Sequence, residues 1–125
     1  MKELLIKKCL KCGAQIEVLK DCNCNDCGIM CCGEQMKDVK FNSVDAAVEK
    51  HIPTYEIKNN EIIVTVNHVM EEEHYIEWIC YKTSKKEMYT YFNKGEDATT
   101  IFPYNGKGYI YSSCNKHGIW KNSID

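Results

Sequence analysis

Short apolar runs broken by polar residues extend through the last two thirds of the chain. At residues 61–66 the sequence EIIVTV places Ile62, Val64 and Val66 on one face of an extended chain, whereas Ile63 falls on the other face. Alternation with a period of two is typical of a β-strand that has one buried face. The pattern therefore predicts a strand at residues 61–66.

A second alternating run, HYIEWICY, occupies residues 74–81. In a regular strand it would place His74, Ile76, Trp78 and Cys80 on the same side. A cysteine among apolar neighbours commonly behaves as a small hydrophobic residue. We therefore expect Cys80 to be a buried strand thiol and not a ligand.

Three further strands are predicted at residues 87–92, 99–102 and 108–112. Turn-forming residues separate them, and the second cluster, YNGKG at residues 104–108, is predicted to be a hairpin loop. Only residues 43–50 suggest a helical turn. Several short strands at close spacing predict a mainly β fold, an antiparallel sandwich or barrel of roughly 85 residues.

The beginning of the chain has a different composition. Seven of the nine cysteines precede residue 33, and few large apolar residues lie between them. Such a segment cannot bury enough surface to fold without a covalent or metal staple. We therefore predict two domains, a metal-stapled one at residues 1–38 and a β domain at residues 39–125.

Composition and charge exclude several classes of protein. With 16 Lys+Arg against 18 Asp+Glu the formal net charge is -2, and no basic block follows the pattern of a nucleic-acid-binding surface. The apolar runs are shorter than the roughly 18 residues of a membrane span, and the start, MKELLIKKCLKC, lacks the apolar core of a signal peptide. We expect a cytoplasmic protein without nucleic-acid or membrane partners.

The cysteine pattern indicates metal thiolates. An odd count, two CxxC pairs and an adjacent pair favour metal binding in a reducing cytosol over a disulfide framework. Four thiolates suit iron or zinc, and we prefer the quartet Cys9, Cys12, Cys31 and Cys32. A competing quartet takes two CxxCG knuckles and consists of Cys9, Cys12, Cys24 and Cys27. The spacing leaves both open, as it leaves open a zinc ion that only holds the segment folded.

A second group of soft ligands lies in the β domain. Cys114 and His117 stand three residues apart on a glycine-containing turn, so both can bind one ion. The other histidines are His51, His68 and His74, and each lies in a connection or at a strand end. Loops at one end of a sandwich can converge, so we predict a site built from these five residues.

These segments carry a specific resemblance. The runs EKHIP at 49–53, HVMEEEHYIEWI at 68–79 and CNKHGIW at 114–120, together with the CxxC and CCGE pairs, resemble superoxide reductases of the desulfoferrodoxin type over nearly the whole chain. The resemblance implies a small desulforedoxin-like N-terminal domain and an immunoglobulin-like seven-stranded sandwich. It also implies reduction of superoxide to hydrogen peroxide without dioxygen, a rubredoxin-like electron donor and a homodimer.

The resemblance further implies roles for single residues. Four equatorial imidazoles and one axial thiolate would hold the active-site iron, namely His51, His68, His74, His117 and Cys114. The N-terminal site would hold a rubredoxin-type iron, with zinc as the alternative. Glu49 and Lys50 match a lid pair in which the carboxylate closes the site and the lysine attracts superoxide.

The chain also departs from the family pattern. The loop between the two halves of the first site carries Cys22, Cys24 and Cys27, which the pattern does not require. Two other functions remain as alternatives, a non-catalytic zinc-binding interaction module and a rubredoxin-like electron carrier built on the first site alone.

Overall fold

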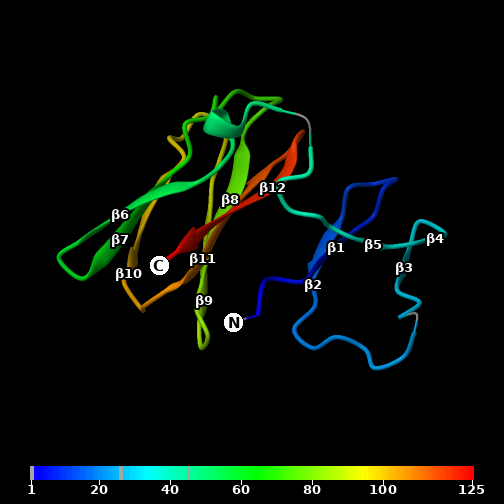
Figure 1. Cartoon of the computed structure of the whole chain (residues 1–125). Coiled ribbons are helices and arrows are strands. Elements are labelled where there is room, and N and C mark those ends of the chain that lie inside the picture. Colours follow the sequence, from blue (N-terminus) through cyan, green and yellow to red (C-terminus); the bar gives the residue numbers. More distant parts are fainter. Residues whose placement is uncertain (1, 26, 45) are drawn as a thin grey trace. The chain divides into compact units, whose positions relative to one another are not determined.

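The computed structural model describes residues 2–25, 27–44 and 46–125, which divide into two compact units, Lys2–Lys40 and Phe41–Asp125 (Figure 1). The regular structure of both units is almost entirely antiparallel β-sheet. The one helix among the described residues is a single 3-10 turn, η1 (Val48–Lys50), within the predicted helical segment. None of the helices formed by the described residues is long and apolar enough to cross a membrane.

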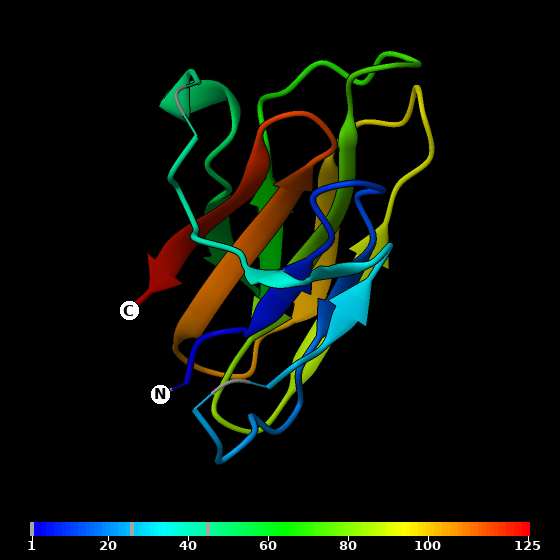
Figure 2. The ribbon, with the colours of Figure 1, turned by 90° about the vertical axis from the view of Figure 1, so that its right-hand side faces the viewer.

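The Phe41–Asp125 unit is a sandwich of two antiparallel sheets, with strand orders β10-β7-β6 and β12-β11-β8-β9 in the described residues (Figure 2). The strands are β6 (Thr54–Lys58), β7 (Glu61–Thr65), β8 (Ile76–Lys82), β9 (Glu87–Tyr91), β10 (Thr99–Pro103), β11 (Gly108–Cys114) and β12 (Gly118–Ile124). Three strands facing four, joined by crossovers between the sheets, form an immunoglobulin-like arrangement. The predicted mainly β fold is therefore confirmed.

The core lies between the two sheets. Ile62 and Val64 of β7 are fully buried there, together with Ile79 of β8 and Ile110 of β11. Each such side chain stabilises the fold by about 1.5–3 kcal/mol relative to an exposed position. The face predicted for residues 61–66 is confirmed.

The predicted alternation at residues 74–81 is wrong at its start. Strand β8 pairs with β11 through Trp78 opposite Ser113 and Ile76 opposite Cys114, so Glu77 is an extra residue in a β-bulge. A bulge shifts the alternation by one position. Ile76 therefore belongs to the core between the sheets, as Ile79 does. It does not lie on the same face of the strand as Trp78, as the alternation had predicted.

The segment at residues 104–108 is a crossover and not the predicted hairpin loop. Strand β10 pairs with β7, whereas β11 pairs with β8 and β12 in the other sheet. The buried Tyr81 fixes this connection, because its hydroxyl donates to the Gly106 carbonyl and accepts the Asn105 N–H at 2.9 Å. Turn-forming residues mark a reversal of the chain but do not say which strand it pairs with next.

The sequence pattern did not predict the β6–β7 hairpin. Asn59 and Asn60 form its two-residue loop with φ values of 53° and 63°, between the paired residues Lys58 and Glu61. Two successive positive φ values are typical of a type I′ turn, which asparagine tolerates. The signal in the sequence is the Asn-Asn pair between TYEIK and EIIVT.

The Lys2–Lys40 unit contains shorter strands. The strands β2 (Gln15–Glu17), β1 (Ile6–Lys8) and β5 (Lys37–Asp38) form one antiparallel sheet in that order, and β3 (Met30–Cys31) pairs with β4 (Glu34–Gln35). An ion pair links β1 to β5, with 2.6 Å between Lys7 Nζ and Asp38 Oδ1. Strands of two or three residues have few ladder hydrogen bonds, so the unit depends on other links.

Gly108 is expected to tolerate no side chain. A Cβ atom there would lie 2.0 Å from the carbonyl oxygen of Lys82 on the neighbouring strand, so the backbone would have to shift. We expect Gly108→Ala to lower the free energy of unfolding by about 1–3 kcal/mol, measured by urea unfolding followed through tryptophan fluorescence. The exposed neighbour Lys107 is the control, because Lys107→Ala should change it by less than about 0.5 kcal/mol. Equal stability of the two variants would contradict the close contact.

Candidate metal centres

Five potential ligands lie in connections or at strand ends of the Phe41–Asp125 unit. His51 follows η1, and His68 follows β7. His74 precedes β8, Cys114 ends β11, and His117 lies in the β11–β12 turn. Since neighbouring strands are antiparallel, the start of one strand and the end of the next lie at the same edge. The topology therefore brings together residues that are far apart in the sequence.

The four imidazoles form a square. Ring centroids are 4.8 Å apart for His51–His68, 4.5 Å for His68–His74, 4.9 Å for His74–His117 and 4.9 Å for His51–His117. Across the diagonal His51 and His74 are 6.4 Å apart. Neighbouring rings are steeply inclined, at 71–88°, so each turns a ring nitrogen towards the centre.

The nitrogen spacing suits a single metal ion. Nδ1 of His117 lies 3.0 Å from Nε2 of His51 and 3.2 Å from Nε2 of His74. Ligand nitrogens about 2.1 Å from a metal and at right angles to each other are about 3 Å apart. Cys114 Sγ lies 3.4 Å from His68 Nε2 and 3.8 Å from His117 Nδ1, and the five donor atoms all lie within 4.8 Å of one another. The donors present therefore fit one ion with four nitrogens and one sulfur.

Backbone carbonyls orient two of the rings. Nδ1 of His51 lies 2.7 Å from the Ala47 carbonyl oxygen, and Nδ1 of His68 contacts the Val69 carbonyl oxygen. A ring nitrogen that donates to a carbonyl carries the proton, which leaves the lone pair on Nε2 facing the centre. Burial also lowers the pKa of His68, and of His74, so both rings favour the neutral form that binds metals.

The thiol of Cys114 is held in an apolar environment. Burial raises its pKa, whereas the backbone N–H groups of Lys116 and His117 lower it. A thiolate in this position needs a cation beside it, because the charged form loses its hydration on burial. A metal ion at the centre of the square would supply that charge.

Two residues that the sequence pattern did not single out support the square. Trp120 stacks on His51 with 5.2 Å between ring centroids, and its indole N–H donates to the His117 carbonyl at 3.0 Å. Asn115 accepts the Tyr75 N–H and donates to the Glu73 carbonyl, both at 3.0 Å. The run CNKHGIW contains Asn115 and Trp120, but their partners are visible only in the fold.

The lid pair is only partly described. Lys50 is exposed at the end of η1, directly before His51. Glu49 lies in the same turn, but its side chain lies outside the described part of the structure. Cys80 is buried in β8 and is outside both groups of potential ligands.

A second group of potential ligands lies in the Lys2–Lys40 unit. The sulfur atoms of Cys9, Cys12, Cys31 and Cys32 lie within 4.8 Å of one another, with 3.6 Å between Cys12 and Cys31. Cys31 and Cys32 are adjacent in the sequence, and the backbone at Cys32 is left-handed, with φ 52°. The preferred quartet is thus brought together.

The thiols of this quartet affect one another. The backbone N–H of Cys12 lowers the pKa of Cys9 to about 6, whereas Cys9 and Cys12 raise the pKa of Cys31 to about 12. One thiolate therefore suppresses ionisation of the next. Four thiolates together require a cation, so this group also fits a metal ion.

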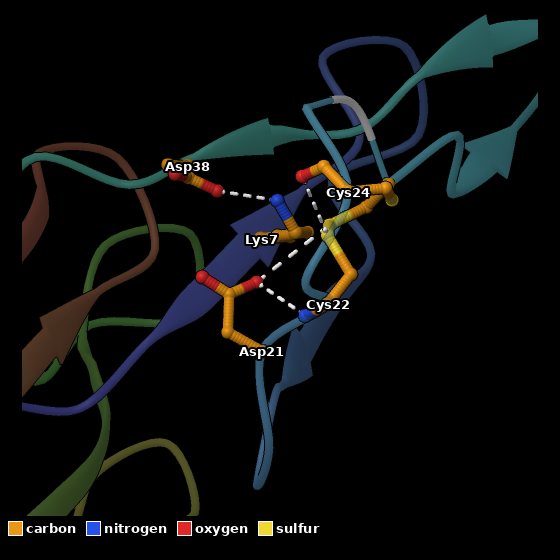
Figure 3. The surroundings of a disulfide bond; sticks show 6 residues. Lys7, Asp21, Cys22, Cys24 and Asp38 are labelled. Atoms are coloured by element: carbon orange, nitrogen blue, oxygen red, sulfur yellow. Dashed lines mark hydrogen bonds and ion pairs between the residues drawn. A yellow bond between two sulfur atoms is a disulfide. The ribbon is translucent and has the colours of Figure 1, made fainter.

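The other three N-terminal cysteines are arranged differently. Cys22 and Cys27 form a disulfide with 5.8 Å between their Cα atoms (Figure 3). The competing quartet with Cys24 and Cys27 would need the Cys27 thiolate, and the structure does not bring these residues to Cys9 and Cys12. The expectation that metal thiolates would replace disulfides is therefore wrong for this pair. Sequence spacing does not distinguish a metal knuckle from a short disulfide loop.

Known proteins resemble the chain over almost its whole length. The desulfoferrodoxin of Desulfarculus baarsii is 38% identical over 125 residues, which cover 96% of each chain. That of Syntrophotalea carbinolica is 36% identical over 126 residues, or 97% of each chain. A superoxide reductase from Treponema pallidum has a similar solved structure, with a TM-score of 0.74 and 29% identity over 97% of this chain and 99% of that one.

The profile of one protein family also matches, and it covers the segment with all four histidines and Cys114. It is described as Desulfoferrodoxin and spans residues 43–123, well over half of the chain. Together with relatives that are more than 30% identical over nearly the full length, this match shows that the chain belongs to the desulfoferrodoxin family.

Proposed function

We propose that the chain is a superoxide reductase, an oxidoreductase that adds one electron and two protons to superoxide and releases hydrogen peroxide without dioxygen. The observation that supports it most is the square of four imidazoles with the Cys114 sulfur beside it. The relatives named desulfoferrodoxin and the similar superoxide reductase structure support the same function. Bound iron would supply the electron by cycling between Fe(II) and Fe(III).

The charges of the ligands suit an anionic substrate. Four neutral imidazoles and one thiolate leave a divalent cation with a formal charge of +1, so the centre attracts a small anion. Four imidazoles and one thiolate would leave a coordination position of the ion open for that anion. The thiolate of Cys114 would donate electron density to the bound metal.

Glu49 and Lys50 are proposed to act at the mouth of this site. Lys50 is exposed and follows Glu49 in the turn that ends at His51. Its ammonium would raise the local concentration of superoxide. The carboxylate of Glu49 would cover the site when no substrate is bound.

The N-terminal unit is proposed as the electron entry site. Residues 1–38 would form a desulforedoxin-like domain whose four cysteines bind iron, with zinc as the alternative, and residues 39–125 the superoxide reductase domain. A rubredoxin-like protein would then serve as donor. We further propose that the protein acts as a homodimer in the cytoplasm.

The central test is the stoichiometry of the reaction after Cys114→Ser. We expect the unchanged chain to form peroxide without dioxygen only while reductant is supplied, and the variant to lose more than about 100-fold in rate because a metal ligand is gone. Superoxide loss, peroxide and dioxygen would be followed together. The control is Cys80→Ala, which removes a buried thiol outside the site and should keep the activity.

Three outcomes would contradict the proposal. Dioxygen formed in proportion to peroxide would indicate dismutation. Full activity of Cys114→Ser would favour an electron carrier built on the N-terminal site. A colourless protein that binds only zinc at both sites would indicate a non-catalytic zinc-binding module.

Lys50→Ala tests electrostatic attraction of the substrate. At 10 mM ionic strength, where the screening length is about 30 Å, we expect superoxide capture to slow about two- to fivefold and its salt dependence to flatten. Pulse radiolysis over a range of salt concentrations would measure this. The control is Lys58→Ala, because Lys58 lies at the opposite end of β6. An equal effect of both variants would remove Lys50 from substrate capture.

Cys31→Ser tests the N-terminal quartet. We expect bound iron to fall from about two ions per chain to about one, because three thiolates do not complete a tetrahedral site. Metal analysis and visible absorption would show the loss, while the sandwich site keeps its absorption. The control is Cys24→Ser, at a cysteine outside the quartet, and loss of iron in that control instead would support the competing knuckle quartet.

A further inference from the structure

The connection between β2 and β3 has an unusual composition for a surface loop. Its described residues, within 18–29, form no strand or helix, and Leu19 is 87% exposed. Three cysteines lie in it with the spacing C-x-C-x-x-C, at positions 22, 24 and 27. None of them belongs to either group of ligands assigned above. The proposed function therefore leaves all three without a role.

The disulfide in this loop is accessible. Cys22 is exposed and Cys27 is half-buried, and Cys24, which lies between them in the sequence, is an exposed thiol. Thiol–disulfide exchange requires a thiolate to approach one of the two sulfur atoms along an open path. Cys22 provides such a sulfur on the surface of the unit.

The bond encloses a short piece of chain. Cys22 and Cys27 are five residues apart in the sequence, and the stabilisation from a crosslink grows with the length of the closed loop. Holding the unit folded is therefore a weak explanation for this pair. A redox role explains accessibility and short spacing together.

A carboxylate lies beside one of the two sulfur atoms. Asp21 Oδ1 accepts the Cys22 N–H at 2.9 Å and lies 3.6 Å from Cys27 Sγ. A negative charge beside a sulfur disfavours its thiolate. In the reduced pair the carboxylate therefore favours the neutral thiol of Cys27, which leaves Cys22 as the attacking thiolate.

We propose that Cys22 and Cys27 form a reversible dithiol–disulfide centre that is opened by an external dithiol and closed by hydrogen peroxide. In opening, a dithiol thiolate attacks Cys22 Sγ, the bond to Cys27 breaks, and Cys27 leaves as a thiolate that takes up a proton. The second thiol of the reagent then releases Cys22 as a thiol and becomes a cyclic disulfide. Two electrons and two protons pass to the protein.

Closing consumes one peroxide molecule. One cysteine thiolate attacks hydrogen peroxide, which gives a sulfenic acid and hydroxide. The other thiol attacks the sulfenic sulfur, the S–S bond forms, and water leaves. A supply of peroxide by this same chain rests on the proposed function, whereas the exchange chemistry of the loop does not.

The test follows the three thiols separately in the folded, metal-loaded full chain. The protein would be alkylated before and after dithiothreitol, and again after one equivalent of hydrogen peroxide, and each cysteine would be read by peptide mass spectrometry. We expect only Cys24 to be alkylated at first, Cys22 and Cys27 to become alkylated together after dithiothreitol, and two thiols to be lost per peroxide. Opening that requires denaturation, or a reduced pair that stays open in peroxide, would overturn the proposal.

Matched variants separate this centre from the proposed function. Cys24→Ser should keep the opening and closing of the Cys22–Cys27 pair, whereas Cys22→Ser should abolish both and leave the reduction of superoxide unchanged. Loss of the disulfide in Cys24→Ser would overturn the assigned pairing. If Cys114→Ser loses superoxide reduction but keeps the opening and closing of the Cys22–Cys27 pair, the two activities are independent. A negative result for one proposal then does not decide the other.

Discussion

Electrostatic repulsion between unprotonated donor atoms is the constraint on which the sandwich site depends. When these nitrogens are all unprotonated, as metal binding requires, pairs only 3.0 Å and 3.2 Å apart direct their lone pairs at the same space, with the Cys114 sulfur nearby. Without a cation, water would hydrate each donor better than its neighbours do. The fold has to hold the donors together, and a bound cation has to make that arrangement favourable. The carbonyls that fix His51 and His68 therefore contribute to affinity for the metal.

The immunoglobulin-like topology meets this constraint through its connections. Antiparallel neighbours bring the ends of β7 and β11 to the same edge as the starts of β6 and β8. The bulge at Glu77 lies directly beside Cys114, where β8 leaves its regular pairing with β11. Bulges commonly redirect a strand near a functional site. The packed core between the sheets is thus the rigid support of the ligands.

The sequence predicted which side chains would lie together better than it predicted how the strands pair. Ligand chemistry depends on residue type, so His117 and Cys114 could be recognised from their spacing and from the family resemblance. The bulge at Glu77 and the crossover after β10 depend on pairing between distant strands, which local alternation does not contain. The bond between Cys22 and Cys27 was missed for a different reason, since the spacing of the two cysteines suits a metal knuckle as well as a short disulfide loop.

The described residues thus bring together the two predicted groups of potential metal ligands and one disulfide, each within a single unit. Soft donors dominate all three, and their neighbours decide whether the sulfur binds a metal or another sulfur. Anomalous X-ray scattering at the iron edge, from crystals of the full chain, tests the central claim most directly. We expect an iron peak bonded to the four histidines and to Cys114. A zinc signal alone at that position, or an iron peak beyond bonding distance of the Cys114 sulfur, would contradict it.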